Sequence, residues 1–146
     1  GTTAATGKTT DVPLEMGKLV IGTNIAGTYF GSVIALRHFR TKGRGRLINM
    51  VGRGRKKPTP TANMYASSKA WIRSFTIALS KEEKNSGIEI HTFNPGLLLT
   101  TLTGKPRLLK GYEGLAETLK KVLLIVGDSN ENAGKDLPAR SFFAVK

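Results

Sequence analysis

The sequence predicts an α/β fold in which helices alternate with the strands of a parallel sheet. Apolar residues recur at helical spacing over residues 13–40 and, with the clearest pattern, over 62–85. Two short apolar runs, 47–51 and 88–93, follow these helices and have the length and composition of buried strands. A further helical stretch at 113–126 completes the order helix, strand, helix, strand, helix, which is the order of a parallel sheet with crossover helices.

The first helix begins at about Pro13, because a missing N–H does no harm in a first helical turn. Its apolar pattern continues to Phe39, and we expect a bend near Gly22 or Gly27, since glycine weakens a helix. Gly43 then ends the helix and leads into the first strand.

The helix over residues 62–85 places Trp71 and Phe75 on one apolar stripe, with charged side chains elsewhere. Gly87 separates this helix from the second strand, and Pro95 stops that strand. The two strands are therefore joined by a helix, as parallel neighbours must be.

Length and composition bound the class of protein. With 146 residues the chain is about one domain long, so we expect residues 1–146 to form a single domain with a poorly defined tail at 128–146. The chain has no cysteine and only two histidines, which lie far apart, so we expect no disulfide and no metal site. No unbroken apolar run approaches the roughly 20 residues of a membrane span. We therefore expect a soluble, cytoplasmic protein without a membrane span.

The positive charge is concentrated in the middle of the chain. The net charge is +13, and no acidic residue lies between Glu15 and Glu82, a stretch that holds 13 lysines and arginines. Such asymmetry indicates binding of a polyanion, whether nucleic acid, a membrane surface or a phosphorylated cofactor. The basic loops 40–46 and 53–57 lack interleaved aromatic residues, so nucleic-acid binding ranks lowest, and the role of these loops stays open.

Tyr65 and Lys69 are the first candidates for chemistry. They are four residues apart at the start of the 62–85 helix, so both side chains emerge on one helix face. A tyrosine has a pKa of about 10, and an ammonium group held nearby favours the phenolate, so we expect Lys69 to lower the pKa of Tyr65. The spacing alone also occurs by chance in surface helices.

The neighbourhood of this pair resembles the short-chain dehydrogenase/reductase family in several ordered places. The resemblance covers roughly residues 1–127 and implies a partial Rossmann-like fold, a doubly wound parallel sheet. The matching segments are Thr23-Asn24-Ile25-Ala26-Gly27, Gly45-Arg46-Leu47-Ile48-Asn49-Met50, Tyr65-Ala66-Ser67-Ser68-Lys69-Ala70 and Asn94-Pro95-Gly96-Leu97-Leu98-Leu99-Thr100.

The resemblance implies a role for each matching residue. Tyr65 is similar to the general acid/base that exchanges a proton with the substrate, and Lys69 to the group that binds the nicotinamide ribose of NADP or NAD. Asn24 resembles the residue that holds a water linking this lysine to solvent. The residues that the resemblance places along the nicotinamide or its pyrophosphate are Pro95, Gly96, Leu98 and Thr100.

Two departures from the family pattern stand out. The family places a serine about thirteen residues before the tyrosine, where this chain has Gly52 followed by Arg53, so we place these two residues on the substrate side. Losing such a hydrogen-bond donor costs about a hundred- to a thousandfold in rate. The glycine-rich turn of the family's cofactor-binding half is also absent, so we expect the chain to be the C-terminal catalytic half, a fragment.

These observations leave three hypotheses. The first is an oxidoreductase that transfers hydride between NAD(P) and a small carbonyl or alcohol substrate. In the family, helices such as those at 13–40 and 62–85 often pack against a second subunit, so a homodimer or homotetramer is implied. The alternative is an inactive remnant of the fold that acts as a binding or oligomerisation module. A basic nucleic-acid-binding protein is the third and lowest.

Overall fold

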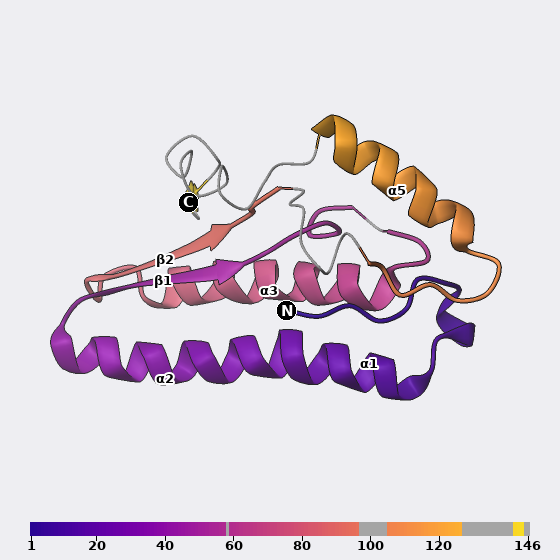
Figure 1. The fold of residues 1–146 in the computed structure, drawn as a ribbon. Coiled ribbons are helices and arrows are strands. Elements are labelled where there is room, and N and C mark those ends of the chain that lie inside the picture. Colours follow the sequence, from indigo (N-terminus) through magenta and orange to yellow (C-terminus); the bar gives the residue numbers. More distant parts are fainter. Residues whose placement is uncertain (58, 97–104, 127–141, 145–146) are drawn as a thin grey trace.

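A computed structural model of the chain describes residues 1–57, 59–96, 105–126 and 142–144. Figure 1 shows the arrangement of its helices and strands. In chain order they are η1 (Thr9–Asp11), α1 (Leu14–Val20), η2 (Ile21–Ala26), α2 (Gly27–Lys42), β1 (Gly45–Met50), α3 (Asn63–Glu82), β2 (Ile88–Phe93), α5 (Glu113–Val126) and β3 (Phe142–Ala144).

The sheet confirms the predicted fold class. β1 and β2 are parallel neighbours in a register that runs from Gly45 opposite Ile88 to Met50 opposite Phe93. β3 adds an antiparallel strand to the other edge of β2, within the stretch that the sequence left as an undefined tail. In the part of the chain that the structure describes, the outer edge of β1 has no pairing strand.

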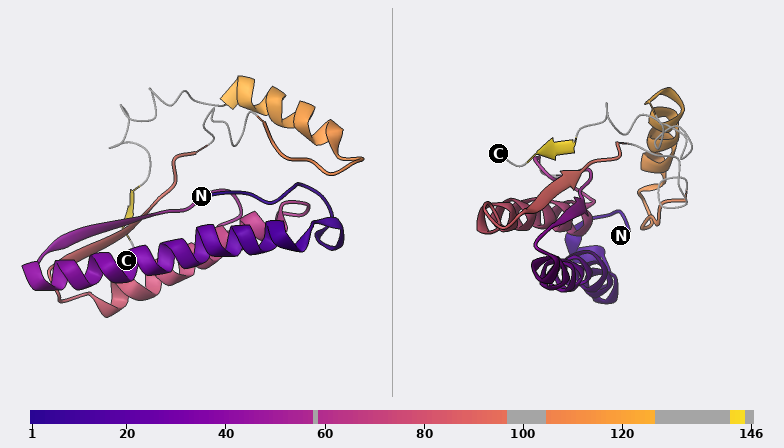
Figure 2. Two further views of the ribbon diagram at one scale, coloured as in Figure 1. Left: turned by 60° about the horizontal axis from the view of Figure 1, so that its bottom comes forward. Right: turned by 90° about the vertical axis from the view of Figure 1, so that its left-hand side faces the viewer.

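The long first helix and α3 lie side by side under one face of the sheet, whereas α5 lies apart from them, beyond the C-terminal ends of β1 and β2 (Figures 1 and 2). Parallel strands present their C-terminal ends, and the loops that follow, at the same edge of a sheet, which is where ligands bind in open α/β folds. The loops after β1 and β2 are therefore the place to look for a site.

The first helix is continuous from Leu14 to Lys42 but contains one irregular segment. Residues Ile21–Ala26 are π-helical, so the irregularity expected near Gly22 takes the form of a widened turn. Such segments are rare and often occur at functional sites. Here the segment contains Asn24, whose side chain is buried.

By length and composition alone, Leu14–Lys42 is also apolar enough to cross a membrane, with a mean hydropathy of 1.5 over its best window. Glycines and polar residues interrupt this stretch, so it contains no long unbroken apolar run. Core helices of soluble proteins, which are mostly buried, meet the same criterion, but only 22% of this window is buried inside the protein, so length and composition do not separate the two cases. Val20 and Leu36 face the interior, while Phe30 and Ile34 are exposed.

The core lies between α2, α3 and the sheet. Its apolar cluster comprises Leu36, Leu79, Ile88 and Ile90, with Phe39, Leu47 and Phe75 packed against it. Next to this cluster, the Asn49 amide of β1 donates hydrogen bonds to Thr76 Oγ1 of α3 at 3.0 Å and to Ser32 Oγ of α2 at 3.3 Å. All three polar residues are buried, so the network ties both helices to the first strand.

Candidate active site

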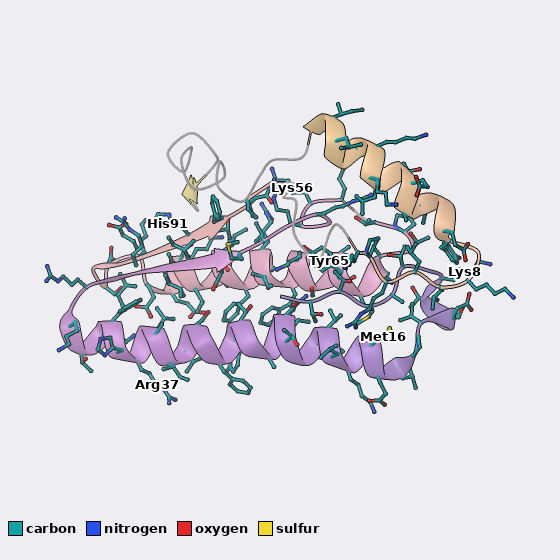
Figure 3. All side chains as sticks on the ribbon, viewed as in Figure 1. Lys8, Met16, Arg37, Lys56, Tyr65 and His91 are labelled. Carbon is teal, nitrogen blue, oxygen red and sulfur yellow. The ribbon has the colours of Figure 1, made fainter. Side chains whose placement is uncertain are left out.

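Tyr65 and Lys69 lie in the first two turns of α3, on the same side of the helix as the sequence predicts. Figure 3 places Tyr65 at the end of α3 that lies toward α5. Lys69 is only 7% exposed, and its Nζ lies 5.7 Å from the centroid of the Tyr65 ring. The ammonium group donates a hydrogen bond to the Met50 carbonyl at 3.1 Å, which ties α3 to the end of β1.

The electrostatics of this pair differ from the sequence prediction. Burial raises the pKa of Tyr65 above its ordinary value, so the expected lowering by Lys69 is wrong for this structure. Burial likewise lowers the pKa of Lys69. Desolvation is the cause in both cases, because it disfavours the charged form of each group. Tyr65 is therefore the neutral phenol at neutral pH, which is the proton-donating form.

Asn24 reaches this site through a serine that sequence reasoning missed. Its Nδ2 donates to Ser68 Oγ at 2.9 Å, and the Ser68 hydroxyl donates to the Tyr65 carbonyl at 2.7 Å. The amide of Asn24 also exchanges two hydrogen bonds with the backbone of Thr2, at 2.8 and 2.9 Å. The π-helical turn is thus bonded to the first turn of α3. The available signal was that Ser68 lies one helical turn after Tyr65.

Gly52, thirteen residues before Tyr65, lies close to the Tyr65 hydroxyl group. A Cβ at this position would lie 2.7 Å from the Tyr65 hydroxyl oxygen, so the phenol occupies the space that a side chain would need. The backbone N–H groups of Gly52 and Arg53 have no hydrogen-bond partner among the described residues. They are potential donors to a substrate oxygen.

A cavity of about 200 Å³ opens beside Tyr65. The predicted site residues Gly52, Arg53, Pro95 and Gly96 line it together with Tyr65, although they come from three separate segments. The N-terminal segment at residues 3–7 and Val51 supply much of the remaining wall. Lys69 and Asn24 are buried and do not line the cavity. Leu98 and Thr100 lie outside the described residues.

The sequence model for short chain dehydrogenases matches residues 1–108 of the chain. The chain belongs to the short-chain dehydrogenase family. That assignment confirms the resemblance on which the roles of Tyr65, Lys69 and Asn24 were inferred, while the roles themselves stay predictions.

Relatives and solved structures agree with the family assignment. An uncharacterized oxidoreductase of Staphylococcus epidermidis is 30% identical over 96 residues, which cover 66% of this chain and 42% of the relative. A 3-ketoacyl-(acyl-carrier-protein) reductase from Brucella melitensis, complexed with NADH, has a TM-score of 0.66 and 26% identity, covering 84% of this chain and 56% of that one.

A putative NAD(P)-dependent gluconate 5-dehydrogenase from Beutenbergia cavernae, with bound NADP, has a TM-score of 0.76 at 18% identity. The match covers 99% of this chain and 58% of that protein, and it supports the fold alone. This chain thus spans less than half the length of the curated relatives it matches.

Residues in and next to the cavity are suited to the nicotinamide end of a dinucleotide. Lys69 makes a single hydrogen bond within the described residues, so its ammonium retains donors for the hydroxyl groups of a ribose. Pro95 and Gly96 border the same cavity as Tyr65. The sequence holds no glycine-rich turn after a strand, so a site for the pyrophosphate is not evident in this chain.

Proposed function

We propose that this chain is the catalytic half of an NAD(P)-dependent oxidoreductase that transfers hydride between the nicotinamide and a carbonyl or alcohol substrate. One observation carries the proposal: Tyr65 borders a cavity that is also lined by Pro95 and Gly96, and the buried Lys69 places its ammonium nitrogen 5.7 Å from the centroid of the Tyr65 ring. The nicotinamide, when bound, supplies or accepts the hydride.

Tyr65 moves the proton in this proposal. Because burial raises its pKa, the phenol is protonated at neutral pH and donates from Oη to the oxygen of a carbonyl undergoing reduction. In the oxidation direction a phenolate would accept the alcohol proton. When Tyr65 has lost its proton, the buried ammonium of Lys69 attracts the negative charge on the phenolate. Burial makes this attraction stronger than it would be in water.

The substrate oxygen also needs a donor that replaces the serine of the family. We propose the backbone N–H groups of Gly52 and Arg53, which lie beside Tyr65 and have no partner among the described residues. Preorganised backbone donors stabilise a developing oxyanion well, and one donor accounts for about two to three orders of magnitude in rate.

The adenosine and pyrophosphate end of the dinucleotide would be held by the family's cofactor-binding half. The chain spans 42% of its Staphylococcus epidermidis relative. The outer edge of β1, which has no pairing strand in the described part of the chain, is where the neighbouring strand of a larger parallel sheet would add.

We further propose a homodimer or homotetramer in the cytoplasm. The support comes from the outward side of the first helix, because several of its apolar side chains are exposed in the single chain. Apolar patches of this kind mark protein–protein contacts. Its exposed members are Leu14, Leu19, Ile21, Tyr29, Phe30 and Ile34.

An inactive remnant that acts as a binding module is the second candidate. The glycine at position 52 favours it, because the family's usual catalytic set has a serine at this position. Trp71 separates the two candidates, since it lies on α3 two residues after Lys69 and stacks on Phe75 at 4.8 Å. Quenching of its fluorescence by NADPH supports a dinucleotide site. A signal unchanged by NADPH supports the remnant.

Transfer of deuterium tests the proposed reaction directly. The protein, expressed from its intact reading frame, is incubated with carbonyl compounds and with NADPH or NADH deuterated at C4 of the nicotinamide. We expect an alcohol product one mass unit heavier than with unlabelled cofactor. Absence of labelled alcohol across both cofactors and a broad carbonyl panel would contradict the proposed function.

A further inference from the structure

A second cavity adjoins the one beside Tyr65. Its volume is about 480 Å³, and it shares several lining residues with the first, including Arg53, Thr61 and Gly96. A ligand that reaches Tyr65 with one end therefore has space to extend past Arg53. The larger cavity lies between the loop after β1 and helix α5.

The charges that line these cavities have one sign. Arg53 is the charged side chain lining the first cavity, and Arg53 and Arg55 line the second. No carboxylate lines either cavity within the described residues. The sequence accounts for part of this, because Arg53 and Arg55 lie in the stretch between Glu15 and Glu82, which has no acidic residue. An anionic group would thus meet attraction without a competing carboxylate.

The opposite wall of the larger cavity is apolar. Leu115, Leu119 and Val122 recur at helical spacing along α5 and all line this cavity, together with Leu108 from the preceding loop. Leu115 and Val122 remain about 40% exposed in the protein alone, at 42% and 40%. Burying this surface under a ligand is favourable, at roughly 25 cal/mol per Å² of apolar area.

From this arrangement we propose that the substrate is an amphipathic anion: a carbonyl compound with an apolar body and a carboxylate or phosphate group that Arg53 binds. The inference rests on the proposed function, because it assumes that the carbonyl lies at Tyr65. Arginine suits this role because its planar guanidinium donates two parallel hydrogen bonds to such oxyanions. The apolar body lies against α5.

Matched ligands test the charge preference by binding alone. We would measure the affinity of the protein for 4-acetylbenzoate and for its methyl ester, which share the ketone and the aromatic ring but differ in charge. A charge-assisted hydrogen bond predicts that the acid binds about ten- to a hundredfold more tightly than the ester. Equal affinity for the two compounds would overturn the inference.

Arg53→Gln should reduce this preference to less than about threefold, while Arg53→Lys should retain part of it. Arg37→Gln is the matched control, because it removes the same charge from an exposed position on α2, away from Tyr65 (Figure 3). A preference that survives Arg53→Gln, or that falls equally in Arg37→Gln, would contradict a specific role for Arg53.

The same variants distinguish a substrate anion from a cofactor phosphate. NADPH and NADH differ by one phosphate group, so Arg53→Gln should leave the ratio of their affinities unchanged. If Arg53→Gln alters that ratio and leaves the acid-to-ester ratio intact, the arginine binds the cofactor and the inference fails. A charge preference that depends on Arg53 but comes without any deuterium transfer would support the anion site at Arg53, and would refute the proposed function together with the carbonyl part of this inference.

Discussion

The two halves of α3 bury polar groups for different purposes. In the second half, Thr76 is fully buried, donates its hydroxyl to the Ile72 carbonyl at 2.7 Å and accepts from Asn49 at 3.0 Å. Its polar atoms are therefore paired within the protein, and the network joins α2, α3 and β1. This half of the helix is a scaffold.

In the first half the polar groups are buried but lead to a cavity. Ser68 connects Asn24 to the backbone of Tyr65, whereas the Tyr65 ring borders open space. Burial shifts the pKa values of Tyr65 and Lys69 in the directions that disfavour their charged forms, which is a free-energy cost that a scaffold would not require. Such perturbed groups beside a cavity are typical of a functional site. Substitutions in the two halves should therefore affect different measurements.

A large effect should come from Gly52→Ser, which introduces the family's usual residue. Because a Cβ there would lie 2.7 Å from the Tyr65 hydroxyl, we expect the phenol to be displaced and turnover to fall about a hundredfold. Gly31→Ser is the control, since a Cβ at Gly31 meets no atom within 4 Å. Turnover equal to or above that of the unmodified protein would show that the serine is accommodated.

Ser68→Ala should affect both activity and stability. The substitution leaves the Asn24 amide and the Tyr65 carbonyl without their shared partner, which costs about 1–3 kcal/mol in unfolding free energy. We also expect turnover to fall about tenfold, because a small misplacement of Tyr65 weakens proton transfer. Urea denaturation and steady-state kinetics give the two values. Ser67→Ala, at an exposed neighbour, should change neither one.

Thr76→Val should lower stability and leave turnover unchanged. The variant keeps the shape of the side chain but removes the acceptor of the Asn49 amide, so we expect a loss of about 1–3 kcal/mol, measured by urea denaturation. A fall in turnover as large as that of Ser68→Ala, at a temperature where the variant is fully folded, would erase the distinction between the two halves of α3.

The smallest predicted effect is a pH dependence beyond the end of α3, at Glu83. The Arg40 guanidinium holds the pKa of this carboxyl below its usual value. Its contribution to stability is therefore present above the unfolded pKa of about 4.3 and is lost as the pH falls through the lower, folded value. Glu83→Gln should lower the melting temperature at pH 7 and converge with the unmodified protein at acid pH. A constant difference across this range would contradict the ion pair.

The elements could be predicted from the sequence because their signals are local. The apolar stripe of α3 and Gly87 after it place the helix within a few residues of Asn63–Glu82, and the strand at 88–93 matches β2. The π-helical form of the segment around Asn24 was not predicted, and neither was the hydrogen bond of Asn24 with Ser68, because the two residues are 44 positions apart in the chain.

In the candidate site, too, the sequence predicts local features but not those that depend on contacts between distant segments. The motifs located Tyr65 and Lys69 on one helix face, but they gave the wrong direction for the pKa of Tyr65, because burial is a property of the assembled fold. The close approach of Gly52 to the Tyr65 hydroxyl likewise joins two segments that sequence patterns treat separately. Distances between segments, rather than residue types, are what sequence reasoning could not supply.

The most direct test of the account compares two tyrosines that each lose only a hydroxyl group. In the deuterium-transfer assay, Tyr65→Phe should reduce the rate of alcohol formation about a hundred- to ten-thousandfold, the usual contribution of a general acid. Tyr29→Phe, on the exposed side of α2, should leave the rate unchanged. Equal rates for the two variants would show that the Tyr65 hydroxyl does not donate the proton, and would contradict the central claim.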